Sequence, residues 1–173
     1  AHLALEWRAW PRDDRLTTLG AQALSRGGEQ IAALELLEAR GRAAITAQVE
    51  IQLRLLNKTG RFDEAFLLAK RAVKQGADSL IIQIEKAKAL ERLNRKKEVI
   101  AALSDVLSKD RKNVWALLRR GELLLQSGDL GGSQLDLRSA LEEAPHLNKA
   151  RVALARSYKA SGQYGVSAEL ILE

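Results

Sequence analysis

Few residues of the chain have side chains suited to acid–base or metal chemistry. His2 and His146 are the only histidines among 173 residues, and cysteine is absent, which excludes thiolate nucleophiles, disulfides and thiolate metal sites. His2 stands at the start of the chain and His146 follows the inter-repeat Pro145, so neither has an evident partner for general acid–base catalysis or metal binding. We therefore predict two solvent-exposed histidines, no catalytic residue, no metal ion, no cofactor and no enzymatic activity.

Paired carboxylates and paired glycines are the other patterns with a chemical interpretation. The pairs Asp13-Asp14, Asp63-Glu64 and Glu142-Glu143 stand at expected helix ends, and carboxylates at helix starts are stabilised by the helix dipole. Gly27-Gly28 and Gly131-Gly132 have neither a preceding strand nor the Gly-Lys-Ser or Gly-Lys-Thr of a phosphate loop. We expect helix caps and turns at all of these positions.

The elements that carry these residues are delimited by a turn that recurs at an almost constant interval. The turn residues are Gly28, Gly60, Asn94, Gly128 and Gly162; successive members are 34 residues apart from Gly60 onward, and the first two are 32 apart. Glycine and asparagine adopt the left-handed backbone conformation that ends a helix. A constant period of this length is typical of stacked helical repeats.

Apolar residues recur at helical spacing between the turns, so each repeat is expected to be a helix, a turn and a second helix. The predicted helices lie at 2–10, 13–26, 29–40, 43–58, 62–75, 79–93, 96–109, 113–127, 130–143, 147–160 and 164–172. The position five residues after each turn holds a small or medium side chain throughout, which predicts close approach of two helices. These residues are Ala33, Ala65, Val99, Ser133 and Ser167.

This pattern resembles the tetratricopeptide repeat family, whose unit carries a small residue, a large residue, the Gly turn, Ala and a closing Pro. The repeat at 114–147 is the most similar, with Gly121, Leu124, Gly128, Ala140 and Pro145 in place. The resemblance covers essentially the whole chain and implies an all-α, right-handed superhelical solenoid of antiparallel helix pairs. The family's large residue eight positions before the turn is replaced by Gln52, Lys86 and Arg120.

The same register predicts a single continuous array over residues 1–173. Its parts are the end of a preceding repeat at 1–13 and repeats at 14–45, 46–79, 80–113, 114–147 and 148–173, the last one truncated. The two-residue contraction falls near Gly41 and predicts a local irregularity. Trp7 and Trp10 are expected to pack on a missing repeat, so the chain is interpreted as a window from a longer array.

The resemblance also implies that the first helix of each repeat lines a concave groove on which partners bind. The positions assigned to this groove hold ten basic and four acidic residues, and so carry the whole net charge of +6. Trp115 among arginines is typical of a binding hot spot, or it packs on the neighbouring repeat. The residues expected to bind the partner are Arg54, Lys58, Ile81, Ile84, Lys88, Arg92, Trp115, Leu118, Arg119, Glu122, Lys149, Val152 and Arg156.

These patterns favour a non-catalytic scaffold that binds an acidic peptide or helix of a protein partner in the groove. The asparagines of the family's clamp for chaperone tails are absent, which disfavours such tails. The alternative is a groove for an acidic polymer, either an anionic polysaccharide or nucleic acid, as in a bacterial exopolysaccharide export or envelope assembly. Nucleic acid is disfavoured because the groove lacks several stacking aromatics. The third hypothesis is an enzyme whose catalytic residues lie outside these 173 residues, and the open ends also allow self-association.

The compartment is left open by the sequence. No apolar run approaches the roughly 18 residues of a membrane-spanning helix, and no basic segment precedes a hydrophobic stretch. A chain without cysteine suits both the bacterial periplasm and the cytoplasm, and the resemblance to the periplasmic portions of export proteins favours the periplasm.

Overall fold

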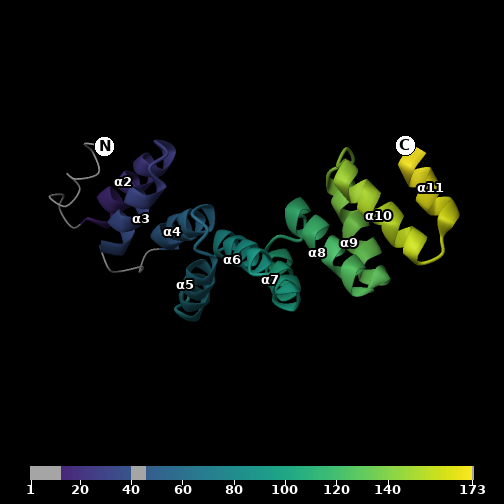
Figure 1. Ribbon diagram of the computed structural model, residues 1–173, viewed down its shortest axis with the longest axis horizontal. Helices are drawn as coiled ribbons and strands as arrows, with labels where there is room; N and C mark the ends of the chain where they lie inside the picture. The colour runs from purple at the N-terminus through teal and green to yellow at the C-terminus, as the bar shows by residue number, and fades with distance from the viewer. Residues whose placement is uncertain (1–12, 40–45, 173) are drawn as a thin grey trace. The chain divides into compact units, whose positions relative to one another are not determined.

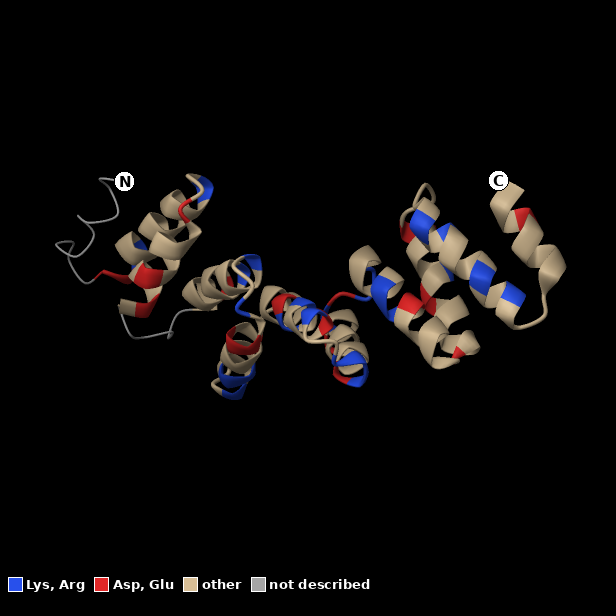
Figure 2. Cartoon of the chain, in the orientation of Figure 1, with Lys and Arg blue, Asp and Glu red and all other residues tan. Residues whose placement is uncertain are grey.

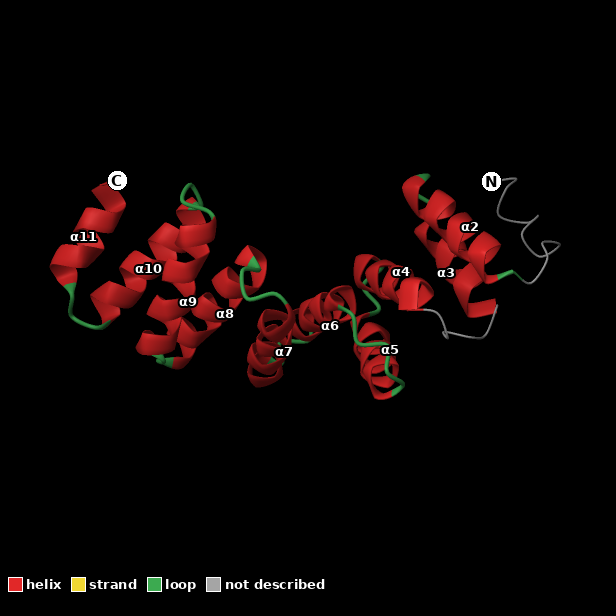
Figure 3. Ribbon diagram, turned by 180° about the vertical axis from the view of Figure 1, so that it is seen from behind, coloured by secondary structure: helices red, strands yellow, loops and turns green. Residues whose placement is uncertain are grey.

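The computed structural model describes residues 13–39 and 46–172, and all regular structure within these ranges is helical (Figures 1 and 3). The expectations for His2, Trp7, Trp10, the helix at 2–10 and the contraction near Gly41 lie outside the described residues. The described helices are α2 Asp14–Arg26, α3 Gln30–Ala39, α4 Thr46–Lys58, α5 Phe62–Lys74, α6 Leu80–Arg92, α7 Lys96–Lys109, α8 Val114–Ser127, α9 Leu130–Glu143, α10 Asn148–Ala160 and α11 Tyr164–Leu172.

The chain divides into two compact units, Ala1–Asn94 and Arg95–Glu173. Helices α2 to α6 belong to the first unit, and α7 to α11 belong to the second. The boundary falls at the turn of the predicted repeat 80–113, so the two helices of that repeat belong to different units.

The predicted helix bounds agree with the structure to within one residue wherever both ends are described. The small differences arise because several predicted first residues are N-caps, which have non-helical backbone angles. Asp13 caps α2 by accepting hydrogen bonds from the backbone N–H groups of Arg15, at 2.7 Å, and Leu16, at 3.1 Å. Asn113 Oδ1 accepts one from Ala116 N at 3.1 Å. The capping interpretation of Asp13 is thus confirmed.

The recurring turn is also confirmed. All five predicted turn residues have positive φ, from 57° at Asn94 to 87° at Gly28. Gly76, which ends α5 before the next repeat, adopts the same conformation with φ 87°. The sequence pattern did not predict Gly76, because this glycine does not recur at the 34-residue interval of the turns.

Asn94 provides a test of the turn, because the other four turn residues are glycines. Asn94→Ala is expected to lower the free energy of unfolding by about 1 kcal/mol, since alanine in the left-handed region carries a steric penalty of roughly 1–2 kcal/mol. Asn94→Gly is the control and should retain the wild-type value. Urea denaturation measures both, and an equal loss in the two variants would show that the asparagine side chain matters more than the backbone angle.

Neighbouring helices pack closely at the predicted position, five residues after each turn. Every residue five positions after a turn is buried, from Ala33 at 0% exposure to Ser167 at 9%. In the first unit the core gathers residues such as Leu36, Leu53 and Ile82 from successive helices. In the second unit α8 packs on α9 and α10 packs on α11 (Figure 1). Each helix pair therefore buries its apolar faces against its sequence neighbours.

Candidate partner-binding grooves

An open groove of about 600 Å³ in the second unit lies between the first helices of two successive repeats. We call it the α8–α10 groove. Its lining residues are Trp115, Leu118, Arg119, Glu122, Asn148, Lys149, Val152, Ala153 and Arg156. The seven site residues that the sequence predicted in this unit are all among them, while Asn148 and Ala153 are additional. Their role in binding remains a prediction.

The repeat register explains why these side chains share one groove. On α8 the lining residues are spaced at i, i+3, i+4 and i+7 from Trp115, which places them on one helix face. The other face of α8 packs into the core, where Ala116 and Gly121 are buried. Lys149, Val152 and Arg156 repeat the pattern on α10, one 34-residue period after Trp115, Leu118 and Glu122. Periodicity alone therefore brings the two stripes together.

The polar side of the α8–α10 groove carries two cations, Lys149 and Arg156, without a partner in the described part of the chain. The exposed side chains of Lys149 and Arg156 form no hydrogen bond or ion pair with any residue that the structure describes. Arg119 differs, because its guanidinium donates a hydrogen bond to Glu122 and the two charges compensate each other. Helix α10 carries Lys and Arg but neither Asp nor Glu (Figure 2). The uncompensated charge of the groove is therefore concentrated on α10.

The apolar side of this groove is smaller than the sequence suggested. Val152 is 42% exposed and Trp115 is half-buried, whereas Leu118 is only 9% exposed. A partner would therefore find Val152 and part of the Trp115 indole, with Leu118 forming the floor beneath them.

A second groove, of about 610 Å³, lies in the first unit between α4 and α6; we call it the α4–α6 groove. Its lining residues are Asn57, Lys58, Thr59, Gly60, Phe62, Lys88, Glu91 and Arg92. Of the predicted site residues in this unit, Lys58, Lys88 and Arg92 line the groove, but Arg54, Ile81 and Ile84 do not. Arg54 is exposed on α4, and the two isoleucines are half-buried on α6.

Glu85 behind the α4–α6 groove corrects the sequence register. Glu85 is one of the four acidic residues that the sequence register assigned to the concave groove, but it is only 5% exposed. Its carboxylate accepts hydrogen bonds from Asn57 Nδ2 at 2.8 Å and from Lys88 Nζ at 2.9 Å. The buried charge is tolerated because it is paired and hydrogen-bonded. Sequence reasoning missed this contact because Asn57 lies in the preceding repeat.

Arg92 of the same groove is held by an aromatic ring. Its guanidinium carbon lies 5.1 Å from the centroid of the Phe62 ring, within the range of a cation–π interaction. This contact leaves the charge of Arg92 on the groove surface while restricting its side chain.

A buried ion pair fixes the orientation of α8. Arg120 donates two hydrogen bonds to the Asp136 carboxylate of α9, Nε to Oδ2 and Nη2 to Oδ1, both at 2.7 Å. Arg120 Nη1 also donates to Ser104 Oγ of α7 at 3.0 Å. The Asp136 carboxylate raises the pKa of Arg120. Arg120, which stands eight residues before the turn at Gly128, therefore makes a polar connection among three helices.

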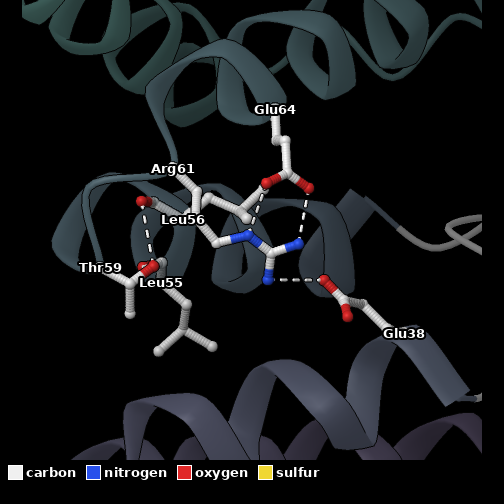
Figure 4. Close-up of polar contacts among 6 residues, drawn as sticks. All are labelled: Glu38, Leu55, Leu56, Thr59, Arg61 and Glu64. Atoms are coloured by element: carbon white, nitrogen blue, oxygen red, sulfur yellow. Dashed lines mark hydrogen bonds and ion pairs between the residues drawn. The ribbon is translucent and has the colours of Figure 1, made fainter.

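A surface network joins the first two repeats (Figure 4). Arg61 donates from Nε and Nη2 to the two carboxylate oxygens of Glu64, both at 2.6 Å, and its Nη1 lies 3.0 Å from Glu38 Oε1. The hydrogen bonds to Glu64 raise the pKa of Arg61, and those from Arg61 lower the pKa of Glu64. Arg95 and Glu98 repeat the bidentate pair one period later.

The lowered pKa of Glu64 predicts a small pH-dependent stabilisation. Because ionised Glu64 is favoured in the folded state, the contribution is present above the unfolded pKa, about 4.3, and is lost as pH falls through the folded pKa. The Glu64 side chain is 54% exposed, so Glu64→Gln should reduce the free energy of unfolding at pH 7 by less than about 1 kcal/mol.

Urea denaturation at several pH values measures this effect, with Glu35→Gln on the exposed face of α3 as the control. The difference between wild type and Glu64→Gln should shrink toward zero at acidic pH and in high salt. A difference that grows as pH falls would contradict the assignment.

Within the residues that the structure describes, no group of three or more His, Asp or Glu side chains could hold a metal ion. In the same ranges, no helix has both the length and the apolar character needed to cross a bilayer.

Comparison with known proteins identifies the fold. No family model matches the chain, and no curated protein matches it in sequence. A solved structure of MamA, residues 41 to the end, from Desulfovibrio magneticus RS-1 is similar, with a TM-score of 0.81 and 17% identity over 94% of each chain. YrrB, described as a TPR protein with an unusual peptide-binding site, gives a TM-score of 0.82 at 15% identity, covering 92% of this chain and 84% of its own. The chain has the tetratricopeptide repeat fold.

A tetratricopeptide repeat protein from Parabacteroides merdae ATCC 43184 is also similar, with a TM-score of 0.79 and 18% identity over 91% of this chain and 64% of that one. The tetratricopeptide repeat fold confirms the predicted all-α class and the helix-pair unit. At these identities the likeness concerns the fold alone.

Proposed function

We propose that this tetratricopeptide repeat chain is a non-catalytic scaffold that binds an acidic, partly apolar segment of a protein partner in the α8–α10 groove. The observation that carries the proposal is the combination of exposed Val152 with the cations Lys149 and Arg156 on one groove wall, which have no ion-pair partner within residues 13–39 and 46–172. The peptide-binding site that is named for YrrB, a protein of the same fold, supports a peptide as the ligand.

Charge and apolar contact have separate roles in this proposal. Exposed cations at the rim accelerate encounter with an acidic partner and select against basic ones. Affinity comes from desolvating the apolar surface of Val152 and Trp115, since aromatic residues at the centre of an interface dominate binding energies. The α4–α6 groove, with Lys58 and Arg92, is an independent second surface of the same character.

Selection of peptides from an unbiased display library tests the proposal. We expect selected peptides to contain Asp or Glu together with an apolar residue, and to lose most of their affinity for Val152→Asp and for Arg156→Glu. The matched control is Arg138→Glu, which reverses an exposed charge on α9 outside both grooves. Selection of basic peptides, or unchanged binding to Val152→Asp, would overturn the proposal.

A salt titration separates this function from binding of an acidic polymer. The affinity of a polyanion such as polygalacturonate should fall steeply with salt, because many counterions are released on binding. A peptide anchored by Val152 and Trp115 should retain most of its affinity at high ionic strength. If the chain bound the polymer tightly and selected no peptide from the library, the ligand would be an acidic polymer rather than a protein partner.

A further inference from the structure

We infer that the segment bound in the α8–α10 groove is an α-helix with two carboxylates seven residues apart and an apolar residue between them. The inference rests on the proposed function and adds the conformation and spacing of the partner. It follows from the order of the exposed side chains along α10.

The binding groups on α10 are arranged as cation, apolar residue, cation. Lys149, Val152 and Arg156 lie at positions i, i+3 and i+7, so they form one stripe on the helix. At a rise of 1.5 Å per residue, the two cations are attached about 10.5 Å apart along the axis. Leu118, which lines the same groove one period before Val152, provides an apolar floor at the middle of the stripe.

A helical partner reproduces this spacing with all three groups on one face. Residues at i, i+3 or i+4, and i+7 of a helix span the same distance of about 10.5 Å and point in one direction. An extended segment does not reproduce this spacing. Its residues on one face are two or four positions apart, which corresponds to about 6.6 Å or 13 Å. Residues three positions apart in an extended segment are separated by about 10 Å, but their side chains point to opposite faces.

The side of the groove formed by α8 is compatible with this inference, because its two charged residues form an ion pair with each other. Arg119 pairs with Glu122 on the same helix, so this wall does not require a third charged group from the partner. The partner is therefore expected to direct both carboxylates to α10 and its apolar residue toward Val152 and Leu118.

Four synthetic alanine-rich peptides of equal composition, apart from one proline, test the inference by fluorescence polarisation with the whole chain. Two are in register, Glu-x-x-Leu-x-x-x-Glu and its reversed order, which correspond to the two directions in which a helix can lie. In the third, the second Glu is moved to five residues after the first. In the fourth, a proline at a position between Leu and the second Glu breaks the helix.

One in-register peptide is expected to bind at least about tenfold more tightly than the shifted and proline peptides, a difference of roughly 1.4 kcal/mol. Arg156→Glu should abolish this advantage, and changing the opposing Glu of the peptide to Lys should restore it. Lys149→Glu should likewise abolish the advantage, and changing the other Glu of the peptide to Lys should restore it. Arg138→Glu on α9 should leave all affinities unchanged.

Three results would overturn the inference. Equal affinity of the proline and in-register peptides, with binding still lost in Val152→Asp, would retain the groove function and exclude the helix. Failure of all four peptides to bind would also exclude the helical pattern, while the library selection would still decide the proposed function. Failure of the charge reversal to restore binding would exclude Arg156 as the carboxylate partner.

Discussion

Asp136→Ala is expected to lower the stability of the second unit by about 2–3 kcal/mol. The substitution leaves the Arg120 guanidinium without its bidentate partner, and Arg120 is only 24% exposed. Breaking a buried ion pair by removing one partner usually costs 3–5 kcal/mol, and the partial exposure of Arg120 reduces this amount. The loss should appear as faster hydrogen exchange in α8 and α9, because these are the helices that the pair connects.

The double variant Arg120→Met with Asp136→Ala is the control. Replacing both charged groups by apolar ones removes the unpaired charge, so the double variant should be more stable than Asp136→Ala alone by at least about 1 kcal/mol. If the double variant were the less stable of the two, the ion pair would not explain the loss. Both measurements are made on the whole chain, with exchange resolved by peptide.

Gly121→Val is expected to be at least as destabilising, with a loss of about 3 kcal/mol. A Cβ atom at Gly121 would lie 2.7 Å from Leu137 Cγ and 3.4 Å from Asp136 Cβ, and Leu137 is fully buried. Overpacking a close-packed core by added methyl groups costs typically 1–3 kcal/mol, and valine also has a restricted rotamer in a helix.

The graded variant Gly121→Ala separates packing from backbone effects. Gly→Ala in a helix interior normally stabilises by about 1 kcal/mol. At Gly121 the contact with Leu137 is expected to reverse this sign. Gly165→Ala in α11 is the matched control, since its Cβ would have no neighbour within 4 Å, and it should be neutral or stabilising. Equal stabilisation by both alanines would show that α8 and α9 can separate without cost.

Only some of the candidate site could be predicted from the sequence. Seven of the nine residues that line the α8–α10 groove were predicted together, because the groove positions repeat with the same 34-residue period as the core. The α4–α6 groove was predicted in part, since Ile81 and Ile84 do not line it and Asn57 and Phe62 do. Phe62 begins a second helix, so a register that counts groove positions on first helices does not include it.

The sequence by itself determined the local elements of this protein. The left-handed turns at Gly60 and Asn94, the helices between them and the small residues at their contacts depend on backbone preference and on a period of 3.6 residues. Both are properties of a short stretch of chain.

Only the tertiary structure decided which polar groups are removed from water. The burial of Glu85 depends on Asn57, 28 residues earlier, and the orientation of Arg120 depends on Asp136 and Ser104, each 16 residues away. Such pairs form only when neighbouring helices are already packed, because the free energy of burying a charge is set by the partner that packing provides. Packing also decided that Lys149 and Arg156 lie on the groove wall without a partner among the residues that the structure describes.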